Sequence, residues 1–272
     1  MALREIQDGY QHPMSREKKR RLESAVASIH HLHGPQALRK ARDLPKQKTP
    51  PHISTTFPQL DEVTGCGGIP LNALTLLSGK TTSGKLTLAY KTLAAAQKKR
   101  KSSVAILDLN QSCDPDYLER CGIDLARLLI VRPTIDQELG GLLLELVRSG
   151  EFRLLLVDHL ADAQANAAAN RSLRRSLGLL GQQLQRATCG VIFMGEPSPP
   201  WQRWINVDMT APIRRSAALH LELRHERWLT HGVGLTGYRA QARILKSRWT
   251  PHRRSTKIEI VFNGVVRARD TW

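Results

Sequence analysis

One stretch, residues 74–90, limits what this chain can fold into more than any other. It reads LTLLSGKTTSGKLTLAY, in which an apolar run predicts a buried strand and the segment from about Leu86 to Lys99 predicts a helix. The intervening loop has the spacing G-x-x-x-x-G-K, the phosphate-binding part of a P-loop, in the strand–loop–helix setting that the motif requires. Backbone N–H groups in such a loop surround an anion, and the helix N-terminus adds positive potential. The candidate nucleotide-binding residues of the loop are Gly79, Lys80, Thr81, Thr82, Ser83, Gly84, Lys85 and Leu86.

The position after the P-loop lysine departs from the motif. A P-loop enzyme has Ser or Thr there, whose hydroxyl binds Mg²⁺, whereas this chain has Leu86. The loop is therefore expected to hold phosphate, with Lys85 reaching the β- and γ-phosphates, but to lack one metal ligand.

From Ile53 onwards, strand-like and helix-like segments alternate, which predicts an α/β fold with a mainly parallel central sheet and helices on both faces. Strands are expected near 74–78, 103–108, 127–132, 153–158 and 189–195, and helices near 84–99, 114–121, 135–149 and 171–187. Further strand-like runs near 216–223, 239–246 and 257–263 predict antiparallel strands that continue the sheet.

The N-terminal part differs in composition from this core. Residues 1–14 are polar and are expected to be a disordered tail, and residues 15–52 to form a basic helical arm with a proline-bearing linker. The helix is predicted from Ser15 to about Ala41, and the core is residues 53–272. A basic run from Lys18 to Arg21 is either a solvated helix end or a contact with nucleic acid or a partner protein.

A net charge of +17 indicates a polyanionic partner. No apolar stretch has the length of a membrane span, and the N-terminus lacks the apolar core of a signal peptide. The four cysteines are scattered, which disfavours a metal site or a disulfide framework. We therefore expect a cytoplasmic protein without a membrane partner.

Two acidic strand ends could support nucleotide chemistry. Asp158 follows four apolar residues, the form of a Walker B strand, and is a candidate metal ligand for Mg²⁺, although buried strands also end in Asp for capping reasons. Asp108 ends the neighbouring strand, and Asn110 lies where a hydrolytic enzyme needs a carboxylate to activate water. Asn110 cannot accept the proton and Leu86 cannot bind the metal, so hydrolysis would need Thr87, a water molecule or Asp108 to substitute for the missing groups.

Two stretches carry the residue types that bind single-stranded nucleic acid. Residues 196–215 interleave tryptophans with arginines, which suits base stacking and phosphate pairing, although the tryptophans could instead be core or interface anchors. Residues 171–186 begin with three arginines on a predicted helix, which could equally form a solvated face. The candidate DNA-binding residues are Arg171, Arg174, Arg175, Trp201, Arg203, Trp204, Arg214 and Arg215.

The chain also resembles the bacterial RecA family over nearly its whole length. The segments that carry the resemblance are 53–55, 60–61, 65–70, 114–124, 191–193 and the N-terminal helix from Arg21. The resemblance implies ATP or ADP with Mg²⁺ as cofactor, single-stranded DNA as ligand and a possible homo-oligomer. It further implies that Asp114 and Tyr117 hold the adenine ring, and that Lys246 and Arg248 reach a neighbour's nucleotide across a filament interface.

Three residues depart from that family pattern. Leu86 replaces the metal-binding hydroxyl, Asn110 the catalytic glutamate, and Glu196 a glutamine that links the γ-phosphate to a DNA loop. The plan is similar to the ImuA type, an accessory factor in damage-induced mutagenesis. We therefore expect a nucleotide-binding accessory factor in DNA repair or SOS translesion mutagenesis, with weak or no ATP hydrolysis and with RecA or a translesion polymerase as partner. The alternatives are an active DNA-dependent ATPase and recombinase, or an interaction module that ignores nucleotide.

Overall fold

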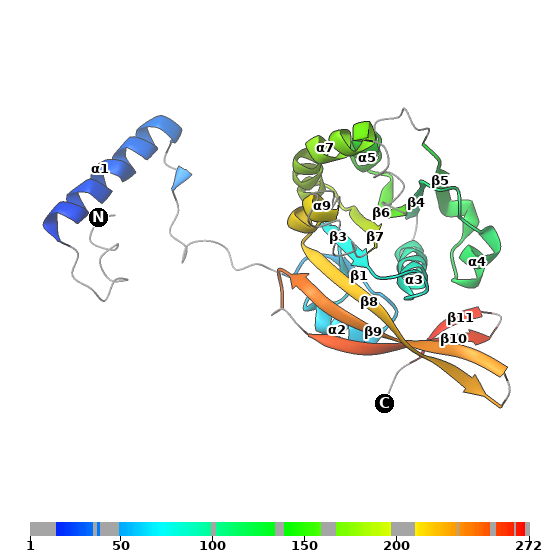
Figure 1. Cartoon of the computed structure of the whole chain (residues 1–272). Helices are drawn as coiled ribbons and strands as arrows, with labels where there is room; N and C mark the ends of the chain where they lie inside the picture. Colours follow the sequence, from blue (N-terminus) through cyan, green and yellow to red (C-terminus); the bar gives the residue numbers. More distant parts are fainter. Residues whose placement is uncertain are drawn as a thin grey trace. The chain divides into compact units, whose positions relative to one another are not determined.

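The computed structural model forms two compact units, residues 1–48 and 49–272, and each is described by itself (Figure 1). It describes residues 15–34, 37–38, 49–98, 102–133, 139–158, 167–196, 210–232, 234–250, 254–263 and 265–269, with the backbone alone for 167–171, 263 and 265–269.

The N-terminal unit contains helix α1 (Arg16–His33). Its first turn is capped by Ser15, whose Oγ accepts a hydrogen bond from the Lys18 N–H at 3.4 Å. The prediction of a helix to about Ala41 is wrong, because the helix ends at Gly34, where φ is 80°. Glycine adopts this conformation readily, and it terminates the helical hydrogen bonding.

The larger unit is built on a nine-stranded sheet with the strand order β11-β10-β9-β8-β3-β7-β6-β4-β5. The strands from β8 to β5 in that order run parallel, and β8, β9, β10 and β11 pair antiparallel. This arrangement confirms the predicted α/β architecture. The parallel strands other than β8 are β3 (Leu74–Ser78), β4 (Ser103–Asp108), β5 (Leu128–Val131), β6 (Phe152–Asp158) and β7 (Gly190–Gly195).

The antiparallel strands are longer than predicted. They are β8 (Leu219–His231), β9 (Gly234–Ser247) and β10 (Ser255–Asn263), and they are followed by β11 (Val265–Arg269), which was not predicted. Beyond Leu223, β8 is largely exposed and polar on both faces, so its sequence lacks the apolar alternation that marks a strand. Four short elements were also not predicted: β1 (His52–Ile53), α2 (Pro58–Thr64), β2 (Ile69–Pro70) and α9 (Thr210–Ser216).

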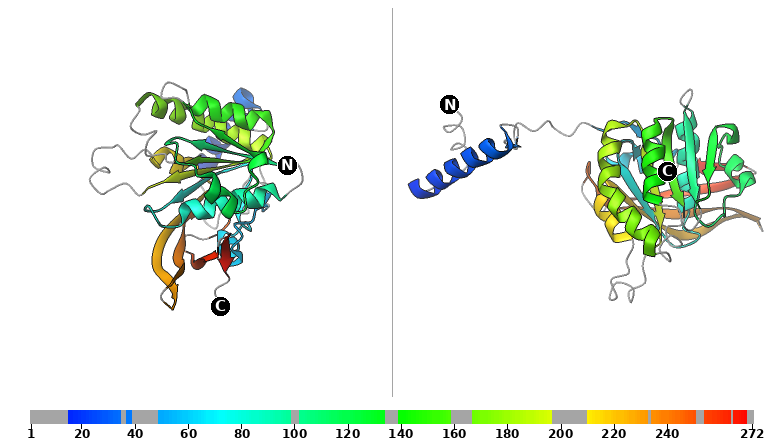
Figure 2. Two further views of the ribbon diagram at one scale, coloured as in Figure 1. Left: turned by 90° about the vertical axis from the view of Figure 1, so that its right-hand side faces the viewer. Right: turned by 90° about the horizontal axis from the view of Figure 1, so that it is seen from above.

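Helices cover both faces of the parallel strands, as the edge-on view shows (Figure 2, left). On one face lie α3 (Lys85–Gln97), α4 (Pro115–Arg120) and a short 3₁₀ turn (Leu125–Arg127), and on the other lie α5 (Leu139–Ser149), α7 (Ala167–Arg186) and α9. None of the described helices has the length and apolar character needed to cross a bilayer.

Alternate side chains of each parallel strand enter two separate cores. In β3, Leu77 packs on the α3 side and Leu76 on the α5–α7 side; in β7, Ile192 and Phe193 divide in the same way. All four are almost fully buried. This period of two in strands that are buried on both faces explains why their sequences are continuous apolar runs. Because these strands run parallel, their carboxyl ends lie at one edge of the sheet, and the P-loop follows β3 at that edge.

Candidate nucleotide-binding site

The P-loop lies at the carboxyl end of β3, with β7 and β8 as its parallel neighbours. Gly84 has φ 89° and caps the start of α3. A Cβ at Gly84 would lie 2.8 Å from the Tyr238 hydroxyl oxygen, and one at Gly79 would collide with the Ser83 side chain and the Leu223 carbonyl oxygen. Both glycines of the motif are thus required by close packing around the loop, and at Gly84 also by the backbone conformation.

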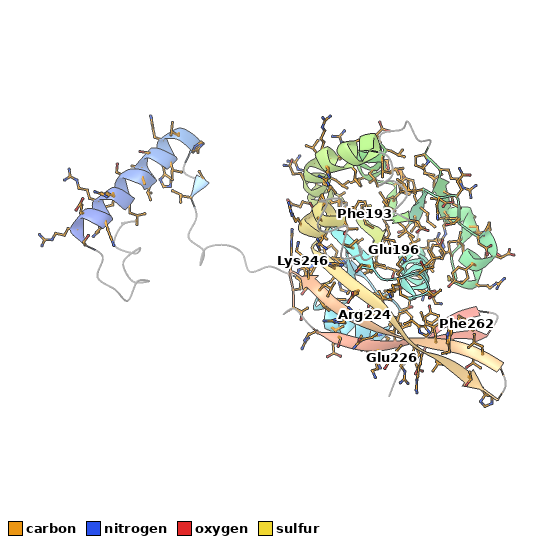
Figure 3. The ribbon with its side chains drawn as sticks, viewed as in Figure 1. Phe193, Glu196, Arg224, Glu226, Lys246 and Phe262 are labelled. Carbon is orange, nitrogen blue, oxygen red and sulfur yellow. The ribbon has the colours of Figure 1, made fainter. Side chains whose placement is uncertain are left out.

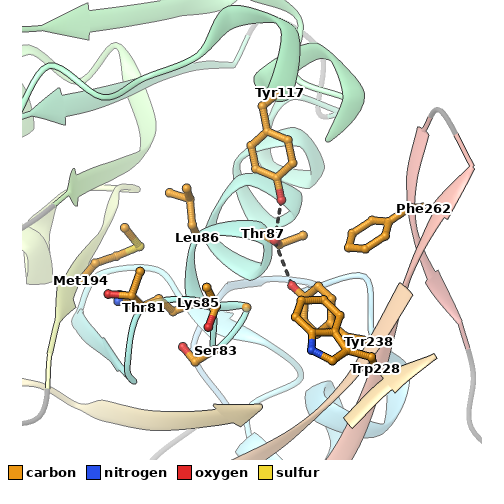
Figure 4. Close-up of a pocket in the computed structure, with 12 residues that line it drawn as sticks. Thr81, Ser83, Lys85, Leu86, Thr87, Tyr117, Met194, Trp228, Tyr238 and Phe262 are labelled. Carbon is orange, nitrogen blue, oxygen red and sulfur yellow. Dashed lines mark hydrogen bonds between the residues drawn. The ribbon is translucent and has the colours of Figure 1, made fainter. Parts of the chain in front are cut away.

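The loop forms one wall of a pocket of about 420 Å³ (Figure 4). This volume is within the usual range for small-molecule sites. We call it the P-loop pocket, and its lining residues are Thr81, Thr82, Ser83, Gly84, Lys85, Leu86, Thr87, Tyr117, Met194, Trp228, Tyr238 and Phe262. Of the predicted nucleotide-binding residues, Thr81 to Leu86 and Tyr117 meet in this pocket. Gly79, Lys80, Asp114 and Asp158 are not part of its lining.

The Lys85 ammonium group is held inside the chain by three acceptors. It donates to the Gly79 carbonyl at 3.1 Å, to the Lys80 carbonyl at 3.4 Å and to Glu196 Oε1 at 3.2 Å. The same carboxylate oxygen accepts a hydrogen bond from Thr81 Oγ1 at 2.9 Å. Glu196, the residue after β7, therefore binds both Thr81 and Lys85 of the P-loop.

A phosphate group fits the loop. Besides Lys85, the pocket is lined by Ser83, whose hydroxyl oxygen is buried beside Gly79 and has no hydrogen-bond partner among the described residues. The fixed N-terminus of α3 and the turn around Gly84 supply the positive end of a helix.

Magnesium fits the same loop poorly. Leu86 contributes an apolar side chain to the pocket where the motif requires a hydroxyl. The next hydroxyl, Thr87 Oγ1, is 2.6 Å from the Tyr117 hydroxyl and accepts a hydrogen bond from the Tyr238 hydroxyl at 3.1 Å (Figure 4). Thr87 is 4% exposed and its oxygen is engaged by both rings, so it does not replace the missing ligand.

This Tyr117–Thr87–Tyr238 chain of hydroxyl groups connects α4, α3 and β9. Burial raises the pKa of Tyr238 to about 12 and also raises the pKa of Tyr117. Both phenols stay protonated at neutral pH and can keep donating. Tyr117, predicted to hold the adenine ring, is therefore fixed by its hydroxyl at the side of the pocket.

The sequence did not predict the aromatic wall of the pocket, which packs against the loop at Gly84. Trp228 of β8 and Tyr238 of β9 are paired across the strands, with ring centroids 5.9 Å apart, and Phe262 of β10 lies 5.7 Å from Tyr238. His225 stacks 6.0 Å from Tyr238 and 4.6 Å from Trp228. Trp228 is 51% exposed. These aromatic residues are widely spaced in sequence, and only the strand register brings them together.

The two acidic strand ends have different surroundings. Asp108 and Asp158 are direct neighbours in the β4–β6 register, and both are buried. The Asp108 carboxylate accepts hydrogen bonds from the N–H groups of Ser112 and Cys113 at 2.9 and 3.2 Å and pairs with Arg132 at 3.1 Å. Asp108 thus shapes the loop after β4, and a metal role for Asp158 stays a prediction.

Two other predicted residues have local structural contacts. The Asp114 side chain caps α4 by accepting from the Asp116 N–H at 3.0 Å. Asn110 is exposed, and its side-chain oxygen accepts a hydrogen bond from the Ser112 hydroxyl at 2.7 Å.

The predicted DNA-binding residues are only partly described. Trp201, Arg203 and Trp204 lie outside the described residues, as does the side chain of Arg171. Arg174 and Arg175 are exposed on α7.

Arg214 and Arg215 lie in the last turn of α9, and the structure places them beside the predicted interface pair. Lys246 donates hydrogen bonds to the carbonyl oxygens of Arg214 and Arg215 at 3.0 and 2.7 Å and so closes the end of α9 (Lys246 is labelled in Figure 3). Burial, with the nearby charge of Arg248, lowers the pKa of Lys246. We call Arg214, Arg215, Lys246 and Arg248 the α9 basic cluster. Because Lys246 is bound to its own chain, contact with a neighbouring subunit would compete with this cap.

Comparison with known proteins agrees with this geometry. The family model of the RecA N-terminal domain matches residues 20–195. Protein RecA of Aquifex aeolicus (strain VF5) is 27% identical, over 90% of this chain and 75% of that protein. Protein RecA of Aquifex pyrophilus is 28% identical, over 93% of this chain and 77% of that protein, and Protein RecA of Clostridium perfringens (strain 13 / Type A) is 26% identical, over 92% and 75%. Because the family model covers more than half of its length, the chain belongs to the RecA family.

Proposed function

We propose that this chain is a nucleotide-binding and DNA-binding accessory factor in DNA repair or damage-induced mutagenesis, with weak or no ATP hydrolysis. Its ligands are a nucleotide in the P-loop pocket and single-stranded DNA, and its protein partner is RecA or a translesion polymerase. The coarser part of this proposal, action on DNA in repair or recombination, is supported by family membership and by relatives that are each named Protein RecA.

The observation that carries the low hydrolysis is the pairing of Lys85 with Glu196 beside an apolar Leu86. Hydrolysis of a triphosphate by a P-loop enzyme relies on a lysine, a metal ion and a group that positions or activates water. Here the Glu196 carboxylate is paired with Lys85, Leu86 replaces the metal-binding hydroxyl, and Asn110 cannot act as a base. The two side chains that could substitute for these groups, Thr87 and Asp108, are hydrogen-bonded to other residues of the chain.

DNA binding is supported by charge. The net charge is +17, and the α9 basic cluster gathers cations from two elements that are distant in sequence. Guanidinium and ammonium groups pair well with phosphates, and binding of this kind is sequence-independent.

A phosphate-release assay with Mg²⁺, ATP and single-stranded DNA tests the low hydrolysis. We expect release near the background of the reagents, and no further decrease in Lys85→Ala. Lys98→Ala, which changes an exposed lysine at the end of the same helix, is the matched control. Turnover in the unmodified chain that Lys85→Ala abolishes and Lys98→Ala retains would instead favour an active ATPase and recombinase.

A thermal-shift titration with nucleotide tests the binding itself. A ligand at 100 times its Kd stabilises the folded chain by about 2.7 kcal/mol. We expect a shift in the unmodified chain and in Lys98→Ala, and its loss in Lys85→Ala. No shift in the unmodified chain would favour the interaction module that ignores nucleotide.

A further inference from the structure

The pairing of β3 with β7 fixes the position of the Glu196 backbone next to the P-loop. Strands β3 and β7 are parallel with Ser78 opposite Gly195, so the residues that follow, Gly79 and Glu196, leave the sheet side by side. The Gly79 N–H also donates to the Gly195 carbonyl at 3.3 Å. The start of the P-loop and the backbone that carries Glu196 are therefore joined.

The Glu196 carboxylate lies at the Lys85 ammonium group, where a phosphate would bind. A lysine ammonium has three donors, and here two meet backbone carbonyls and one meets Glu196. Of these acceptors only Glu196 carries a full negative charge. It is also the one on a side chain that is partly exposed, at 43% against 9% for Lys85. An incoming phosphate would therefore displace the Glu196 carboxylate from Lys85 more easily than it would displace the carbonyl oxygens. The displaced carboxylate would still lie close to the phosphate and would keep its negative charge.

This shared charge matters more for a triphosphate than for a diphosphate. The lysine of a P-loop reaches the β- and γ-phosphates, so the terminal group of a triphosphate and Glu196 would compete for one cation. A bound metal ion ordinarily neutralises part of that charge, but Leu86 offers no ligand and Thr87 Oγ1 is bound by two tyrosines. Two like charges held within a few ångströms around one lysine repel each other.

The rest of the pocket still suits a nucleotide. Its aromatic side, Tyr117, Trp228, Tyr238 and Phe262, offers flat apolar surfaces to a base, and its P-loop side carries the Lys85 ammonium group and the N-terminus of α3 for a phosphate. Figure 4 shows these rings across the pocket from Thr81, Ser83 and Lys85. A nucleotide with a shorter phosphate chain keeps the contacts of this aromatic side and reduces the conflict with Glu196.

We propose that Glu196 makes the P-loop pocket selective for a nucleoside diphosphate, bound without a magnesium ion, over a triphosphate. This inference rests on the proposed nucleotide binding.

Isothermal titration of the full chain with ADP and with ATP, each in Mg²⁺ and in EDTA, tests the proposal. We expect ADP to bind at least about tenfold more tightly than ATP, with similar ADP affinity in both buffers. In Glu196→Gln the preference should fall by about tenfold, mainly because ATP binds more tightly. The control is Glu151→Gln, an exposed carboxylate before β6, which should leave both affinities unchanged.

The outcomes separate this proposal from the one on which it rests. Equal affinities for ADP and ATP, or an ADP affinity that needs Mg²⁺, would overturn the selectivity and leave nucleotide binding intact. An equal gain for both ligands in Glu196→Gln would overturn the role of this residue. No binding of either nucleotide to the unmodified chain and to Glu196→Gln would overturn both proposals together.

Discussion

At the scale of single residues, two side chains of the P-loop pocket change the charge balance in the same direction. Leu86 removes a ligand for a cation, and Glu196 adds an anion at Lys85. Each would weaken the binding of a highly charged phosphate chain, and neither disturbs the packing of the loop around Gly79 and Gly84. The loop can therefore keep its shape while its preference among ligands changes.

Restoring the hydroxyl at residue 86 should make nucleotide binding depend on magnesium. In Leu86→Thr we expect the affinity for ATP to be about tenfold higher with Mg²⁺ than with EDTA, because the motif's hydroxyl ligand is present again. Leu86→Val is the matched control, since valine has the shape of threonine without the oxygen. Titration calorimetry measures both, and the same gain in Leu86→Val would show that side-chain volume, not metal binding, causes it. Phosphate release should stay low, since Asn110 is unchanged.

At the scale of the elements, helix α7 shows how an apolar stripe determines which face is buried. Leu173, Leu177, Leu180 and Leu184 recur at intervals of four, three and four residues and are all buried against the sheet and its neighbouring helices. Leu179, the neighbour of Leu180, is 50% exposed.

This contrast gives a matched pair of substitutions. Leu180→Ala should lower the free energy of unfolding by about 2–5 kcal/mol, because it leaves a cavity beneath the helix. Leu179→Ala should change it by no more than about 0.5 kcal/mol. Urea unfolding followed by circular dichroism measures both values. Similar losses in the two variants would contradict the assigned orientation of α7.

Local sequence patterns were sufficient for the parallel strands and for the P-loop. The run Leu74 to Leu77 is apolar because both of its faces are buried, and the glycines at 79 and 84 mark the loop directly. The aromatic wall depends instead on the pairing of Trp228 with Tyr238. The sequence of neither strand alone predicts that register. The contact between Lys85 and Glu196 likewise requires β7 to lie beside β3. Long-range strand order was the missing information.

At the scale of the whole molecule, the net charge of +17 is the dominant electrostatic property. In the described residues, part of it gathers where α9 meets β9, in the α9 basic cluster. Helix α4 packs into the core on the opposite face of the sheet, and it carries the exposed Arg120. A ligand that binds at α9 should therefore not depend on Arg120.

The salt dependence of DNA binding tests whether the α9 basic cluster contacts DNA. Affinity for single-stranded DNA should fall by orders of magnitude between low and moderate salt, with a log–log slope of roughly −0.7 for each phosphate contact. Arg215→Ala should reduce the steepness of the slope by about 0.7, whereas Arg120→Ala should leave it unchanged. Fluorescence anisotropy over a salt series gives the slopes. A flat titration of the unmodified chain would remove the DNA-binding proposal, and equal effects of the two variants would remove the α9 basic cluster from it.

The order of strands in the sheet also determines when the P-loop strand can pair during synthesis of the chain on the ribosome. Strand β3, which carries the P-loop, pairs only with β7 and β8, and both are synthesised much later (Leu74 lies opposite Val191, and Thr75 opposite Leu219). A growing chain on the ribosome therefore holds β3 with both edges unpaired until β7 has emerged, and with one edge unpaired until β8 follows, and such non-local pairing is slow. Phe262 completes the pocket later still. A nascent chain should thus lack the complete P-loop pocket until Phe262 has emerged.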